Sequence, residues 1–67
     1  LEVVERAIRA MPEARRRCFI MNRYEELSYA EIARRSGMSE TGVRGHVERA
    51  LRDISKALEE PTSRWRK

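Results

Sequence analysis

The feature that most constrains this chain is a helical pattern that is interrupted by a three-residue break. Residues 32–51 read IARRSGMSETGVRGHVERAL, and apolar residues recur at helical spacing on both sides of Gly37, Met38 and Ser39. Glycine can end a helix here because it adopts the left-handed conformation easily, and serine can cap the helix that follows. The break therefore predicts a helix-turn-helix, in which two helices cross at an angle that a continuous helix cannot make.

The remaining sequence also has helical spacing and shows no strand pattern. Met11-Pro12 separates a first helix from a second, because the residue before a proline is pushed out of the α region. Ser28 and Glu31 have the spacing of a capping box at the start of a third helix. Pro61 is expected to end the fourth helix. The predicted helices span about residues 2–10, 13–24, 29–36 and 40–59.

These elements predict an all-α fold: one four-helix domain over residues 1–60, of the winged-helix-like DNA-binding type but without a wing, and a basic C-terminal tail over residues 61–67. Each helix should bury one apolar face, which a rotation of 100° per residue identifies. The expected core residues are Leu1, Val4, Ala7, Ile8 and Met11 in the first helix, Ala14, Cys18, Phe19 and Met21 in the second, Ile32 and Ala33 in the third, and Val43, Val47, Ala50, Leu51, Ile54 and Leu58 in the fourth.

Charge and composition narrow the possible functions. Fifteen Lys and Arg residues against 11 Asp and Glu give a formal net charge of +4, which favours polyanionic partners but also fits an ordinary basic surface. One cysteine and one histidine provide no disulfide and no metal-ligand cluster, and no glycine-rich phosphate loop follows a strand. No apolar run is long enough to cross a membrane. We therefore expect no enzymatic activity, no metal and no cofactor.

The face of the fourth helix opposite its expected core carries groups that suit DNA. Arg49 can make a bidentate contact to guanine in the major groove, whereas Arg52 and Lys56 are better placed for phosphates. Gly42 and Gly45 also lie on this outer half, although each glycine inside a helix costs about 1 kcal/mol relative to alanine. Two interpretations stay open for them: close approach of the backbone to DNA, or simple tolerance of glycine in an unpacked first turn.

Read together, these residues resemble region 4 of a bacterial sigma-70 family sigma factor, in the small extracytoplasmic-function (ECF) group. The resemblance covers about residues 8–58 and depends on MPEARRRCFIMNRYEELSYAEIARRSGMSETGVRGHVERAL. The Met-Pro opening (Leu-Pro is usual), the YEELSYAEIA passage and the Gly-Met-Ser turn are together far more specific than a helix-turn-helix alone. The VRGHVERAL ending fits the family as well, and its combination of His46-Val47 with Arg49-Ala50-Leu51 is most similar to the iron-uptake branch of the group. The sequence departs from the family pattern at Gly42, where threonine is usual, and at Gly45, where serine or a charged residue is common.

The resemblance implies a domain that recognises the promoter −35 element while the β-subunit flap of RNA polymerase holds it, in the bacterial cytoplasm, under the control of an anti-sigma factor. It also implies that the fragment recognises DNA without opening it. By position, Arg44, His46 and Arg49 match places that contact DNA in the family, and Ser28 with Tyr29 matches places that touch the DNA backbone. The full set of candidate DNA-binding residues is Ser28, Tyr29, Ser39, Thr41, Arg44, Gly45, His46, Glu48, Arg49 and Arg52.

Two alternative functions remain open at this point. The DNA-binding output domain of LuxR-type response regulators is also a four-helix helix-turn-helix with a Val-x-x-His pattern, but MPEARRR does not match the usual Thr-x-x-Glu-type start of its second helix. A helical bundle whose basic face binds an acidic protein is the other alternative. Salt-dependent binding to duplex DNA of one particular sequence would separate the DNA-binding functions from the interaction module.

Overall fold

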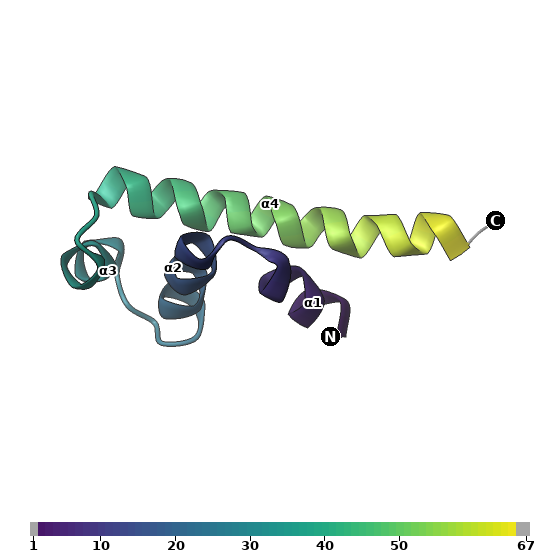
Figure 1. Ribbon diagram of the computed structural model, residues 1–67, viewed down its shortest axis with the longest axis horizontal. Coiled ribbons are helices and arrows are strands. Elements are labelled where there is room, and N and C mark those ends of the chain that lie inside the picture. Colours follow the sequence, from purple (N-terminus) through teal and green to yellow (C-terminus); the bar gives the residue numbers. More distant parts are fainter. Residues whose placement is uncertain (1, 66–67) are drawn as a thin grey trace.

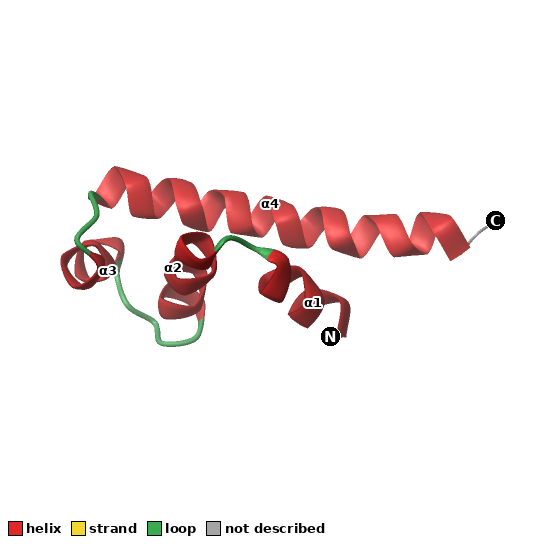
Figure 2. Ribbon diagram, in the orientation of Figure 1, coloured by secondary structure: helices red, strands yellow, loops and turns green. Residues whose placement is uncertain are grey.

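Four helices build the part of the chain that the structure describes. In the computed structural model the backbone is described for residues 2–65 and the side chains for residues 2–59. The helices are α1 (Glu2–Ala10), α2 (Glu13–Arg23), α3 (Tyr29–Ser36) and α4 (Glu40–Trp65). Figure 2 shows only helices and loops in this part of the chain. The predicted all-α class and the helix-turn-helix formed by α3 and α4 are therefore confirmed.

The three short helices lie along one side of α4. Figure 1 shows α3, α2 and α1 following one another along α4, whose C-terminal end extends past them. Each of the three contacts α4, and α2 also contacts α3. The molecule is consequently elongated, with extents of 46 × 18 × 16 Å. One long side of α4 stays uncovered by any other described helix.

Proline and glycine set the helix ends as the sequence predicts. α1 ends at Ala10, and Pro12 stands at the N-cap of α2 with φ −56°. Gly37 ends α3 in the left-handed conformation with φ 70°, and its amide donates to the carbonyl of Ala33. A side chain would be strained at that φ, so the turn before α4 depends on glycine.

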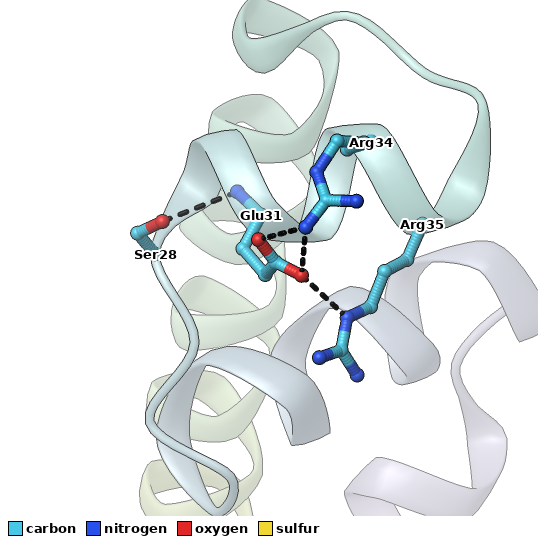
Figure 3. Close-up of polar contacts among 4 residues, drawn as sticks. All are labelled: Ser28, Glu31, Arg34 and Arg35. Carbon is cyan, nitrogen blue, oxygen red and sulfur yellow. Dashed lines mark hydrogen bonds and ion pairs between the residues drawn. The ribbon is translucent and has the colours of Figure 1, made fainter.

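Serines cap the two helices of the helix-turn-helix. The Ser28 hydroxyl accepts the N–H of Glu31 at 3.1 Å, and the Ser39 hydroxyl accepts the N–H of Gly42 at 3.0 Å. The second bond of the predicted capping box does not form. The Glu31 carboxylate instead accepts from Arg34 at 2.6 Å and from Arg35 at 2.8 Å (Figure 3). Two charged donors within the same helix hold the carboxylate more strongly than one neutral backbone N–H does.

The loop between α2 and α3 has one backbone position in an unfavourable conformation. Glu26 has φ 58°, which is the left-handed region that L-residues other than glycine rarely occupy. The Leu27 N–H donates to the carbonyl of Met21 at 3.0 Å, and the Asn22 side-chain amide donates to the carbonyl of Leu27 at 2.9 Å. These hydrogen bonds hold the loop closed in spite of the conformation at Glu26.

The core consists of two clusters that α2 links. Cys18 belongs to the cluster nearer the helix-turn-helix, and Phe19 belongs to the cluster nearer α1. Cys18 is fully buried, and burial raises the pKa of its thiol despite the nearby charge of Arg17. The buried members are Cys18, Ile32, Ala33, Val43 and Val47 in the first cluster, and Ile8, Met11, Phe19 and Ala50 in the second.

Three expected core residues are exposed instead. Leu51 is 39% exposed and Leu58 is 51% exposed, and Ala14 also lies at the surface. For the two leucines the physical reason is that all three short helices lie on one side of α4, so the covered sector of α4 is narrow. Leu51 and Leu58 lie at the edge of this sector rather than inside it. The prediction for Leu1 falls outside the described residues.

The predicted end of α4 is also wrong, because the helix continues to Trp65. Pro61 lacks an N–H and so removes one hydrogen bond to the carbonyl of Ala57, but its fixed φ of about −65° is itself helical. Past the end of the bundle, such a carbonyl can bind water instead. The region predicted as a basic tail therefore begins inside a helix. No described helix is long and apolar enough to cross a membrane.

Candidate nucleic-acid interface

The uncovered face of α4 carries most of the candidate DNA-binding residues. It lies opposite Val43 and Val47, which are 0% and 2% exposed and face the short helices. No other described helix covers it (Figure 1). A free helix of this kind can enter the DNA major groove, where its outward side chains meet the base edges. The candidates that are exposed on α4 are Thr41, Arg44, Glu48, Arg49 and Arg52.

One flank of this face is fixed to α3 by a cation–π contact. The Arg44 guanidinium lies over the Tyr29 ring, 5.7 Å from its centroid. Tyr29 is half-buried and packs against the cluster that contains Val43. Ser28, one residue earlier, is exposed. The structure thus brings three candidates from the two helices of the motif together, at the start of α3 and the start of α4.

The first turn of α4 explains one of its two glycines. A Cβ built at Gly42 would lie 3.2 Å from the hydroxyl oxygen of Ser39, which caps the helix through the Gly42 N–H. A side chain there would press on the cap. A Cβ built at Gly45 meets nothing within 4 Å. Packing within the described part of the protein therefore favours glycine at position 42 but not at position 45.

His46 lies on the other flank of the helix. Its ring is half-buried, and Nδ1 is buried without a hydrogen-bond partner among the described residues. The structure therefore places His46 at the edge between the core face and the exposed face of α4, rather than fully on the exposed face.

The basic side chains of α4 form no ion pairs with described residues. This holds for Arg44, Arg49, Arg52 and Lys56. Glu48, which stands four residues before Arg52, does not pair with it. These cations remain available to an anionic partner.

Sequence reasoning missed one arginine that reaches this region from α2. Arg15 donates through Nη1 to the Asp53 carboxylate of α4 at 2.6 Å. The two residues line a shallow hollow together with Arg49, Arg52 and Lys56. The only signal in the sequence is that Asp53 stands next to Ile54 at the edge of the buried face, and this signal does not identify its partner.

The arrangement as a whole supplies hydrogen-bond donors on an exposed helix. Guanidinium groups match guanine edges and phosphate oxygens, and serine hydroxyls and backbone N–H groups at helix starts commonly contact phosphates. Glu31, at the start of α3, is held as a carboxylate because the hydrogen bonds from Arg35 and Arg34 lower its pKa.

Comparison with known proteins gives one result that bears on this face. The family model described as Sigma-70, region 4 matches residues 1–54. No curated protein and no solved structure matches the chain significantly. The matched range contains α1, α2, α3 and the first part of α4, including every candidate DNA-binding residue.

Proposed function

The chain belongs to the sigma-70 region 4 family, and from this premise we propose that it recognises the promoter −35 element as region 4 of an ECF sigma factor. Region 4 is the DNA-binding domain with which sigma factors recognise this element, and it is not a catalytic family. The observation that carries the proposal is the exposed face of α4, the helix that follows the Gly37 turn. On this face Arg44, Arg49 and Arg52 have no acidic partners among the described residues.

In this proposal the first part of α4 lies in the major groove. Arg49 makes a bidentate contact to a guanine, which gives sequence preference. Glu48 and Thr41 reach base edges on the same face, and Gly45 lets the helix backbone approach the DNA closely because nothing occupies the space beside it. Arg52 contacts a phosphate and adds affinity for any sequence.

The start of α3 holds the DNA backbone on one flank. The Ser28 side chain is exposed, and the Tyr29 hydroxyl can reach a phosphate while the ring packs under Arg44. This contact supports a fixed distance between the phosphate-contacting and base-contacting parts of the motif. Ser39 and His46 complete the set at the start and on the other flank of α4.

Protein partners follow from the same proposal. The domain, residues 1–60, binds the β-subunit flap of RNA polymerase in the bacterial cytoplasm. An anti-sigma factor regulates it, as is common among the ECF sigma factors that the sequence resembles, in the iron-uptake branch. Tyr24 and Leu51 are 67% and 39% exposed. In this proposal these exposed side chains are among those that contact the protein partners.

Binding selection on random duplexes tests the proposed function. The 67-residue chain, fused to the polymerase flap, should enrich one short sequence, and its affinity should fall steeply as salt rises. Equal recovery of all sequences at low salt would contradict sequence recognition. It would favour the alternative in which the basic face binds an acidic protein.

A further inference from the structure

The ion pair between Arg15 and Asp53 differs from all others in the described part of the chain, because it joins two helices. The remaining ion pairs connect residues three or four positions apart on one helix. The Arg15 and Asp53 side chains are only 22% and 38% exposed, and their charged atoms are 2.6 Å apart. Arg15 Nε is buried and has no partner of its own among these residues, so Asp53 is the one acidic group that holds this guanidinium.

Asp53 has other cations within helical reach. Arg49 stands four residues before it and Lys56 three residues after it, the two spacings at which charged side chains on a helix meet. Both line the same hollow as Asp53, together with Arg52 and Glu59. Neither Arg49 nor Lys56 pairs with Asp53, whose Oδ2 accepts from Arg15 instead.

We propose that Arg15 is a positioning residue: it holds the Asp53 carboxylate away from Arg49 and Lys56 and so leaves those cations free for DNA. The effect of Arg15 on Asp53 is inferred from the geometry of the hollow. The effect on DNA recognition rests on the proposed function. Without Arg15, the Asp53 carboxylate pairs with Arg49 or Lys56. Arg49 is then less available to contact the bases. The sequence preference then weakens even though no residue on the exposed face has changed.

The test compares Arg15→Ala with the double variant Arg15→Ala/Asp53→Ala. Affinities are measured for a duplex selected by the wild-type chain and for its scrambled version. The single variant should reduce the ratio of the two affinities by about two- to fivefold, the range expected when a partly exposed ion pair competes for Arg49. The double variant should restore the ratio, because the competing carboxylate is gone.

Two further variants separate this role from simpler ones. Arg9→Ala makes the same change of charge on α1 and should weaken both duplexes equally, leaving their ratio unchanged. Asp53→Asn keeps Arg15 and removes the carboxylate, and it should retain the ratio. Melting temperatures of all variants establish that binding is compared between folded proteins.

Three outcomes would overturn the inference. An unchanged ratio in Arg15→Ala would show that Asp53 does not compete. A double variant that stays as impaired as Arg15→Ala would mean that Arg15 affects recognition independently of the Asp53 carboxylate. A ratio reduced in Asp53→Asn would mean that the pair acts only as a structural link between α2 and α4.

A measurement without DNA keeps the inference separate from the proposed function. The Nε–H signal of Arg49, followed by NMR in the free protein, should shift in Arg15→Ala and return in the double variant. An unmoved signal would mean that Asp53 does not turn to Arg49 when Arg15 is absent, and this would contradict the inference whatever the chain binds. A shifted signal in a chain that selects no DNA sequence would leave the capture standing and refute the proposed function.

Discussion

The basic residues of the three short helices and those of α4 differ in what neutralises them. On α1 and α2, Arg6, Arg9 and Arg17 each stand four residues after a glutamate and lie within 4.0 Å of it. On α3, Arg34 and Arg35 share Glu31. On α4 no basic residue pairs with an acidic one of its own helix within the described range. Among the described residues, four cations without an acidic partner stand on α4 (Arg44, Arg49, Arg52 and Lys56), against two on α2 (Arg16 and Arg23).

The difference shows why a charge count says little about a binding face. The acid-before-base spacing that pairs Glu2 with Arg6 also occurs at Glu48 and Arg52, yet only the first pair forms. Exposed pairs of this kind are weak, so a small difference in side-chain geometry decides whether they form. What distinguishes α4 is its uncovered face together with the capture of Asp53 by a residue of α2.

The largest effect is expected in the core that α4 shares with the short helices. Val47 is 2% exposed and packs against residues of α2 and α3. Val47→Asp buries an unpaired charge there, which should destabilise the domain by about 3 kcal/mol or more and unfold it. Circular dichroism during a thermal melt measures this. Thr41→Asp, an exposed control on the same helix, should melt like the wild type. A cooperative, wild-type-like melt of Val47→Asp would mean that the buried face of α4 is assigned wrongly.

The next largest effects are expected on DNA binding, when basic residues of α4 are replaced and compared with one of α1. Arg49→Ala should lower the discrimination between the selected and the scrambled duplex by about 1–3 kcal/mol, because a bidentate base contact is lost. Arg52→Ala should weaken both duplexes alike and reduce the salt slope by about one. Arg6→Ala, which removes a paired arginine, should leave the discrimination unchanged. Equal losses on both duplexes for Arg49→Ala would count against a base-reading role.

Local signals in the sequence predicted the fold well. The Gly37 turn, the caps at Ser28 and Ser39 and the start of α2 at Pro12 depend on neighbouring residues, and the structure has them all. The errors at Leu51 and at the end of α4 have a different origin. They depend on how wide a sector of α4 the short helices cover and on where they stop covering it.

The candidate site was also predictable where it depends on one helix and not where it depends on contacts between helices. Helical periodicity placed Arg49 and Arg52 on the outside of α4, and the structure has them there. It could not reveal that Arg15 reaches Asp53 or that Arg44 lies over Tyr29, because both contacts join residues of different helices. Whether any of these residues binds DNA stays a prediction.

A smaller effect, on stability alone, is expected in the loop between α2 and α3. Glu26 has φ 58°, and Glu26→Gly relieves that conformation, so the variant should gain about 1 kcal/mol. Thermal melts measure the gain, and the discrimination between duplexes should not change. Glu25→Gly is the matched control, because Glu25 does not have a positive φ and glycine there only adds freedom to the unfolded chain. A lower melting temperature for Glu26→Gly would show that the loop is not strained.

The smallest effect is expected at Glu31 of α3, because removing its carboxylate would leave two paired arginines of a short helix without an acidic partner, like those of α4. The hydrogen bonds from Arg35 and Arg34 lower the pKa of Glu31 in the folded state from its usual value of 4.5 (Figure 3). Its contribution to stability is therefore present above about pH 4.5 and is lost as the pH falls through the lowered pKa. In Glu31→Gln this part of the pH dependence should disappear from the melting temperature. Glu40→Gln, which changes an acid of α4 that forms no ion pair with a described residue, should keep it.

Removing the carboxylate at position 31 also tests what pairing does to a cation. In Glu31→Gln at neutral pH, Arg34 and Arg35 lose their acidic partner and become comparable with the basic residues of α4. Affinity for the scrambled duplex should then rise slightly and become more dependent on salt, because two more cations are available to phosphates. Affinity that stays the same would mean that α3 presents these arginines away from DNA. Pairing by Glu31 would then have no bearing on binding, and the position of a cation on the fold would decide its role.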